Sequence, residues 1–278
     1  MNRPFFSIII PTFNQAKFLS IALRSIKNQK FKKFEVIVID NFSTDSTRSV
    51  ISEFKKYFKK KLIYKKIKNN GIIAKSRNRG IKISKGDWLC FLDSDDYWLP
   101  NKLAYVFNLI KTKNYEVICH SEIVINNLKN KKKIWSFGPL TKNFYKTLLL
   151  KGNRLSTSAT CVKRDFINEK KIEFDENKIF VTAEDYSFFL KIAKFKAYFY
   201  FINEPLGCRL IHSNSASYQK QKHFKAVKSV LRYHVTHIQN IVRNKNTLWN
   251  LVYNNFNFRN NIIPQNKNKL FLEYYFNF

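Results

Sequence analysis

Strand-like and helix-like segments alternate through the first part of the chain, and this alternation limits the fold more than any other feature. Short β-branched or apolar runs occur at 7–10, 35–40, 62–67 and 87–92. Between them apolar residues recur at helical spacing, as in Phe18, Leu19, Ala22, Leu23 and Ile26. Because such alternation builds βαβ units, the sequence predicts an α/β fold with a mainly parallel central sheet flanked by helices.

The second half of the chain is less regular. Segments 156–162, 197–202 and 208–211 have the pattern of strands, a helix opens at 182–185, and an amphipathic helix is predicted over 224–242. No internal repeat or Gly/Ser linker interrupts the chain. We therefore expect a catalytic domain over 1–217, with halves at 1–105 and 106–217, and a helical, basic extension over 218–278.

The charge of the chain points to its surroundings. The 278 residues include 51 Lys and Arg against 19 Asp and Glu, a net charge of +32. This excess favours a polyanionic partner such as nucleic acid, anionic lipid or a phosphorylated substrate, although a general preference for lysine accounts for part of it. No run approaches the ~18 apolar residues of a membrane span, and the N-terminal apolar run is too short for a signal peptide. We therefore expect a cytoplasmic protein.

The cysteines are widely separated and form no CxxC pair, which argues against a zinc ribbon or a dense disulfide framework. We expect reduced and mostly buried thiols at Cys90, Cys119, Cys161 and Cys208.

Polar residues gather where three of the predicted strands end. They are Pro11, Thr12 and Asn14 after the first, Asp40 and Asn41 at the second, and Asp93, Ser94, Asp95 and Asp96 after the fourth. Ligands of parallel α/β sheets bind beyond the carboxyl ends of the strands. The spacing therefore predicts a binding site at this edge.

The carboxylates suggest the chemistry of that site, and each has a structural alternative. Asp93 and Asp95, two residues apart after a strand, can hold one Mg²⁺ or Mn²⁺ together with phosphate oxygens, or can belong to a turn that caps the next helix. Asp40 can accept a hydrogen bond from a nucleobase or a ribose, or can cap a turn. Glu184 and Asp185 can supply a general base, or can stabilise the start of a helix.

Four segments, in order and spacing, make the sequence resemble the family 2 glycosyltransferases, which are inverting, nucleotide-sugar-dependent enzymes of GT-A fold. They read SIIIPTFNQAKFLSIALRSI, EVIVIDNFSTDST, NNGIIAKSRNRGI and GDWLCFLDSDDYWLPNKL. The resemblance covers about residues 5–103, and it resumes at the ED pair and at CRLIHSNSAS.

The resemblance implies roles for individual positions. Thr12 and Asp40 hold the uracil and ribose of a UDP donor, and Asp185 is the catalytic base with Glu184 beside it. The full set of implied donor-binding positions is Pro11, Thr12, Asn14, Asp40, Asn41, Arg77, Asn78, Asp93, Ser94, Asp95 and Arg209. The implied ligands of a divalent metal are Asp93, Asp95 and His212. The segment that closes over the diphosphate contains Arg209, His212, Ser215 and Ser217.

These residue types suit sugar transfer. Cations stabilise the charge that develops on a diphosphate leaving group, and one carboxylate accepts the proton of the attacking hydroxyl. A single base without a nucleophilic carboxylate suits one displacement with inversion, by analogy with glycoside hydrolysis. The expected acceptor is a hydroxyl of a glycan or of a polyprenyl-diphosphate-linked sugar in cell-surface polysaccharide synthesis.

The extension suggests a membrane partner. From residue 205 onward there are eleven Lys or Arg and one acid, with aromatic residues interleaved. This pattern predicts contact with an anionic membrane surface at the inner face of the cell membrane, or a helical appendage packed on the domain with a solvated basic face. The remaining alternatives are a nucleic-acid-binding protein, for which no RRM, zinc-finger or KH signature is present, and a sugar nucleotidyltransferase, which would carry a glycine-rich loop after the first strand. We expect no nucleic-acid partner.

Overall fold

The computed structural model describes residues 3–126, 128–212, 220–237 and 245–260. In this part of the chain one sheet runs in the order β3-β2-β1-β4-β8-β6-β9-β5, and β7 pairs with β6 beyond the end of β8. The strands are β1 (Phe6–Thr12), β2 (Phe34–Asp40), β3 (Leu62–Lys66), β4 (Trp88–Phe91), β5 (Tyr97–Trp98), β6 (Val117–Asn126), β7 (Lys131–Trp135), β8 (Thr160–Lys163) and β9 (Phe199–Ile211).

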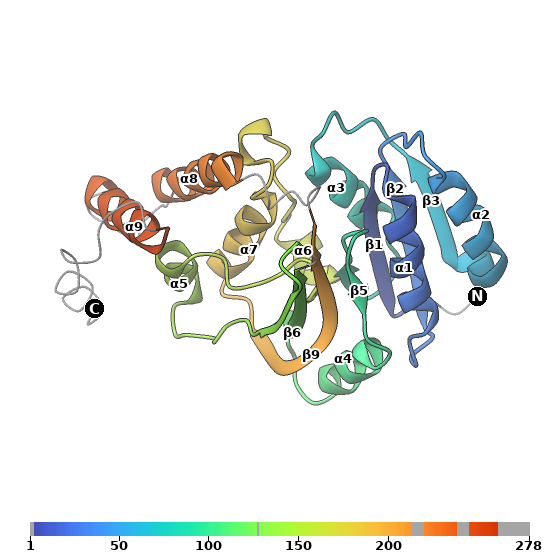
Figure 1. Ribbon diagram of the computed structural model, residues 1–278. Coiled ribbons are helices and arrows are strands. Elements are labelled where there is room, and N and C mark those ends of the chain that lie inside the picture. The colour runs from blue at the N-terminus through green and yellow to red at the C-terminus, as the bar shows by residue number, and fades with distance from the viewer. Residues whose placement is uncertain (1–2, 127, 213–219, 238–244, 261–278) are drawn as a thin grey trace.

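Helices lie on both faces of the sheet, and α5, α7, α8 and α9 pack together at one end of the molecule (Figure 1). They are α1 (Ala16–Lys27), α2 (Thr47–Phe58), α3 (Ile73–Ile83), α4 (Lys102–Ile110), α5 (Phe144–Lys151), α6 (Arg164–Glu169), α7 (Glu184–Lys194), α8 (Lys220–Thr236) and α9 (Lys245–Arg259), with 3₁₀ turns η1 (Lys59–Lys61) and η2 (Lys178–Phe180). The four N-terminal strands are parallel, and antiparallel pairs enter where β8 joins β4. The predicted α/β fold class is confirmed.

The two faces of the sheet are buried in two separate cores. Along β1, Ile8 and Ile10 pack with the apolar faces of α1, α2 and α4, while Ile9 packs with α3 and α7 on the other side. Successive strand residues point to opposite faces, so a strand covered on both sides must be apolar throughout. The uninterrupted apolar runs of β1 and β2 have this cause.

Some strand boundaries differ from the predicted ones. β1 continues through Pro11. The pairing of β1 with β4 ends at Ile9 and Phe91, so no strand lies where the N–H of residue 11 would donate, and a proline costs no hydrogen bond there. The segments predicted as two strands, 197–202 and 208–211, form the single strand β9, whose register against β6 shifts around Pro205. β8 starts at Thr160 rather than at 156.

The C-terminal helices pack on the domain. Ala226, Val230 and Leu231 of α8, and Val252 and Phe256 of α9, belong to the same buried cluster as α5 and α7. The predicted helix over 224–242 is present as far as Thr236, and its remainder lies outside the described residues. Among the helices described, none has the length and apolarity to cross a membrane. The four cysteines are buried and free, as expected.

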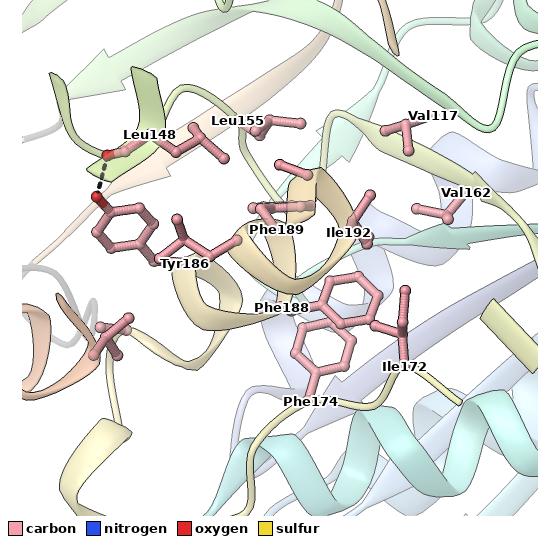
Figure 2. Packing of buried hydrophobic residues seen from close by; sticks show 14 of the residues in the cluster. Val117, Leu148, Leu155, Val162, Ile172, Phe174, Tyr186, Phe188, Phe189 and Ile192 are labelled. Atoms are coloured by element: carbon pink, nitrogen blue, oxygen red, sulfur yellow. Dashed lines mark hydrogen bonds between the residues drawn. The ribbon is translucent and has the colours of Figure 1, made fainter. Parts of the chain in front are cut away.

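Helix α7 is fixed firmly by its apolar face (Figure 2). The Phe188 ring stacks on Phe174 with ring centroids 3.9 Å apart, and the Tyr186 hydroxyl donates to the carbonyl of Leu148. Because these contacts anchor the helix body, its first residues, Glu184 and Asp185, have a defined position next to the sheet edge.

Candidate active site

The carboxyl ends of β1 and β2 lie side by side, as the spacing predicted. Thr12 and Asp40 are register partners, and the amide of Asn41 donates to the Thr12 carbonyl at 3.0 Å. The loops that follow are tied together by Asn14, whose amide donates to Ser43 Oγ (2.9 Å) and whose Oδ1 accepts from the Thr44 amide (2.8 Å). Asn14 adopts a φ of +49°, which asparagine tolerates better than most residues. Its visible role is to shape this rim.

Asp40 is completely buried at the end of β2. Its Oδ1 accepts from the amide (2.9 Å) and hydroxyl (2.5 Å) of Ser43, and its Oδ2 accepts from the Tyr64 hydroxyl (2.5 Å). Burial, and then this bond, raise the pKa of Tyr64. Beside Asp40, the buried Thr12 Oγ1 has no hydrogen-bond partner within the described residues, so a polar atom here is available to a ligand.

An open pocket of about 570 Å³ lies beyond β2, lined by Asn41, Phe42, Lys68 and Asn70. The Phe42 side chain is more than half exposed, and Asn41 Oδ1 accepts from the Asn69 amide at 2.9 Å. An exposed ring beside amides and an ammonium group suits a planar base with phosphates attached.

A buried arginine joins two motifs that lie far apart in the sequence. Arg77 on α3 donates from Nη2 to Asp93 Oδ1 (2.8 Å) and from Nη1 to Glu184 Oε1 (2.6 Å). Its side chain is 3% exposed. Burial raises the pKa of Glu184, and Arg77 opposes that rise. The aspartate cluster and the ED pair are therefore brought to one place by Arg77. The sequence predicted Arg77 as a donor contact and gave no sign of this link.

Asp95 contacts His212, the residue predicted with it as a metal ligand. Their Oδ2 and Nε2 atoms are 3.0 Å apart, and the imidazole stacks on Phe18 with ring centroids 4.6 Å apart. Burial and the neighbouring Asp93 raise the pKa of Asp95. Ser94 is buried, and its hydroxyl donates to Gln15 Oε1. Ser215 and Ser217 lie outside the described residues.

Asp96, the last residue of the cluster, holds the fold together. Its Oδ2 accepts from Ser158 Oγ (2.6 Å) and its Oδ1 accepts from the Leu210 amide (3.1 Å). Ser158 also accepts, through its carbonyl, from the buried ammonium of Lys102 (2.9 Å). Ser158 Oγ also accepts from the Asp93 amide at 3.1 Å, so this one residue, just before β8, ties down both ends of the aspartate loop.

Asp185 lies at the first turn of α7. Its Oδ1 accepts from the Tyr186 amide at 2.8 Å, whereas within the described part of the chain its Oδ2 makes only long contacts, to Asn153 Nδ2 (3.3 Å) and Thr157 Oγ1 (3.5 Å). One carboxylate oxygen is thus oriented by the helix and the other is weakly engaged, an arrangement that suits a base.

Arg209 of β9 faces the acids. Although burial works against it, the charges of Asp96, Glu122 and Asp185 raise the pKa of the guanidinium. Asn78, in contrast, is turned toward the backbone of Phe174. Its Nδ2 donates to the Phe174 carbonyl and its Oδ1 accepts from the Phe174 amide, both at 2.9 Å. Asn78 therefore anchors the segment before α7, a role the sequence did not reveal.

The family model described as "Glycosyl transferase family 2" matches residues 7–190. The chain belongs to glycosyl transferase family 2.

Curated members of this family are similar in sequence to about 70% of the chain. The amylovoran biosynthesis glycosyltransferase AmsB of Erwinia amylovora is 30% identical over 73% of this chain and 68% of its own length. The Escherichia coli UDP-Glc:α-D-GlcNAc-diphosphoundecaprenol β-1,3-glucosyltransferase WfgD is 29% identical over 68% and 69%. The crystal structure of S. aureus TarS 1-349 in complex with UDP superposes with a TM-score of 0.66 at 22% identity, covering 91% of this chain and 71% of that one. The protein is a glycosyltransferase of GT-A fold, and a sugar nucleotidyltransferase is excluded.

The glycosyltransferase supplies few metal ligands of its own. Within residues 3–126, 128–212, 220–237 and 245–260, no three His, Cys, Asp or Glu side chains converge as a closed metal site. Asp93 and Asp95 fit a hard cation held mainly by substrate oxygens, because Mg²⁺ is commonly bound through one or two carboxylates plus phosphates. Burial and then the charge of Asp93 raise the pKa of Asp95, and a bound cation would offset both effects.

Proposed function

We propose that this glycosyltransferase moves a sugar from a UDP-sugar to a hydroxyl of a glycan or polyprenyl-diphosphate-linked acceptor, with inversion, in cell-surface polysaccharide synthesis. The observation that carries the proposal is the Arg77 bridge, which joins Asp93 to Glu184 and so places the aspartate pair beside the helix that bears Asp185. UDP as the donor nucleotide is supported by the ligand named for TarS, and the acceptor class by the name of WfgD.

The donor is assigned to the edge formed by β1, β2 and the loop after β4. Thr12, Asp40 and Asn41 surround the base and ribose, and the unpartnered Thr12 hydroxyl supports this assignment. Pro11, Asn14, Ser94 and Asn78 shape the loops around the donor. The diphosphate lies near Arg77 and Arg209 and near Asp93 and Asp95, because its negative charge needs the two guanidinium groups and a metal ion beside it.

Asp93 and Asp95 are the residues that would hold Mg²⁺ or Mn²⁺ in this proposal, and His212, the third predicted ligand, contacts Asp95 directly at 3.0 Å and holds it in position. When bound, the metal stabilises the charge that develops on the departing diphosphate. The chain's own contribution is the fixed position of these side chains, because Arg77 orients Asp93 and Phe18 orients His212.

Asp185 acts as the general base. Its Oδ2, weakly engaged by Asn153 and Thr157, accepts the proton of the acceptor hydroxyl as that oxygen attacks the anomeric carbon from the face opposite the diphosphate. The anomeric C–O bond breaks as the new one forms, so the configuration inverts. Glu184 stays paired with Arg77 and positions the start of α7.

The test uses the full chain with a panel of UDP-sugars and Mn²⁺. We expect UDP binding by the wild type, binding within about twofold of it for Asp185→Asn, and a loss of transfer of about 10²–10⁴-fold for that variant. Asp165→Asn is the matched control, because Asp165 is exposed on α6. Asp95→Ala is expected to weaken metal-dependent UDP binding. Wild-type transfer by Asp185→Asn, or absence of UDP binding by the wild type, contradicts the proposal.

We also propose that the protein is cytoplasmic and rests on the inner face of the cell membrane through α8. The exposed side of α8 carries Lys220, Lys222, Lys225, Lys228 and Arg232 and no acid. Since Phe224 and Phe256 pack inward, attraction to anionic lipid supplies the contact rather than buried rings. Charge reversal of Lys225, Lys228 and Arg232 should abolish flotation with phosphatidylglycerol vesicles. Unchanged flotation refutes it.

A further inference from the structure

The register of three strands builds a surface beside the candidate base. Glu122 of β6 pairs with Trp135 of β7, and Val124 pairs with Lys133. On the other side of β6, Val124 pairs with Arg209 of β9. Paired residues in neighbouring strands share a face of the sheet. Trp135, Lys133 and Arg209 are therefore on one face, hereafter the β7 face, and Lys132 and Ile134 are on the opposite one.

Trp135 is exposed on this face, and a neighbouring ring fixes its orientation. Its side chain is 44% exposed, whereas Trp88 and Trp98 are buried. Its ring is stacked at 16° to Phe137, which packs against the core, so the indole has a supported orientation. The Lys133 ammonium lies 5.0 Å and the Arg209 guanidinium carbon 6.0 Å from the ring centroid. An exposed indole in a fixed orientation, with cations beside it, can bind a ligand that has both an apolar ring face and a negatively charged group.

The segment of chain that contains β7 carries charges of one sign. Residues 123–164 contain no Asp or Glu and have ten cations, at Lys129, Lys131, Lys132, Lys133, Lys142, Lys146, Lys151, Arg154, Lys163 and Arg164. On the β7 face itself Lys131, Lys133 and Arg209 outnumber Glu122, which is buried. An anionic ligand complements this surface.

The β7 face also lies next to the reacting centre. Arg209 interacts electrostatically with Asp96, Glu122, Asp185 and Asp93, so the cation beside Trp135 is the one that faces the acids of the site. The amide of Leu210, the next residue of β9, donates to Asp96 Oδ1 at 3.1 Å, so this strand brings Arg209 beside the aspartate loop.

We propose that the β7 face is the acceptor site, and that it takes a saccharide bearing a phosphate group: Trp135 stacks on the apolar face of the sugar ring, and Lys133 with Arg209 binds the phosphate. The identity of this ligand as the acceptor rests on the proposed function. The site itself does not, because it is defined by binding. Arg209 then serves both substrates from a position between them.

Lys132 and Lys133 provide a matched pair of tests, because they are neighbours on β7 and point to opposite faces. The probes are glucose, galactose, mannose and N-acetylglucosamine 1-phosphates, their neutral methyl glycosides, and inorganic phosphate. Each is titrated into the full chain by calorimetry and by tryptophan fluorescence. Saturating UDP and Mn²⁺ keep the probes out of the donor site.

We expect at least one sugar phosphate to bind about fivefold or more tightly than its methyl glycoside and than phosphate, with a change in Trp135 emission. Lys133→Glu should weaken it by about fivefold or more, with Lys132→Glu within about twofold of wild type. Trp135→Ala should weaken it by about tenfold, and Ile134→Ala, on the opposite face, should leave it unchanged.

Equal effects of Lys132→Glu and Lys133→Glu overturn the proposal, as does failure of every sugar phosphate to bind. If the two lysine variants instead lose binding to phosphatidylglycerol vesicles equally while the sugar phosphates do not bind, the surface is a membrane contact and the proposal is also wrong. Failure of wild-type UDP binding in the same preparation refutes the proposed function without deciding this one.

Discussion

Replacing Arg77 by methionine should destabilise the protein by about 3–5 kcal/mol, the usual cost of leaving one partner of a buried ion pair uncompensated. Most of this loss comes from Glu184, whose side chain is 8% exposed and 2.6 Å from the guanidinium. Two unit charges whose centres are about 4 Å apart interact by about 4 kcal/mol at an effective dielectric constant of about 20. Asp93 is 31% exposed, so water screens it and its pairing adds about 1 kcal/mol or less.

The assay is urea unfolding of Arg77→Met, Glu184→Gln and the double variant, with Arg79→Met as control, since Arg79 is exposed on the same helix. The control should change the unfolding free energy by about 0.5 kcal/mol or less. Because Glu184→Gln removes the buried charge, the double variant should recover about 2–3 kcal/mol of the loss. A cost for Arg77→Met within 1 kcal/mol of the control, or two additive single effects, refutes the reasoning.

Three further predictions concern the fold around the site. Burial lowers the pKa of His234 to about 3, whereas in the unfolded chain its pKa is ~6.5, so the unfolded chain binds the proton first as the pH is lowered. The protein therefore has its full stability above pH ~6.5 and loses stability at lower pH, by about 2 kcal/mol at pH 5. Thermal melts across this range should show the loss, and His234→Gln should reduce it. Gly86→Ala should cost about 1–3 kcal/mol or more in urea unfolding, because its Cβ would lie 2.5 Å from the Ser7 backbone nitrogen; a neutral result contradicts the packing. Tyr64→Phe should cost about 1.5–3 kcal/mol by removing the bond to Asp40, and should weaken UDP binding measured by calorimetry; an unaffected Kd would separate Asp40 from the donor site.

Much of the N-terminal half was predictable because its information is local. The strands β1, β2, β3 and β4 and the intervening helices follow from apolar periodicity, and the convergence of Thr12 with Asp40 follows from parallel pairing. The second half was predicted less well. β7 was not predicted, since it is exposed throughout and KKKIW has no buried face to give it a pattern. β6 was not predicted either, since His120, Ser121 and Glu122 interrupt its apolar run although all three are buried. β9 was divided in two because Pro205 interrupts its pattern, although pairing with β6 continues beyond the shift.

By itself the sequence determined the fold class and the family, and it singled out the acids proposed to carry the chemistry, because motif spacing fixes which residues follow which strands. Only the tertiary structure decided what those residues touch. Arg77 meets Glu184 across 107 positions, and Asp95 meets His212 across 117. Trp135 and Arg209 share a face through strand register. Such contacts depend on how distant strands pair and how helices pack between them, and no local pattern records that.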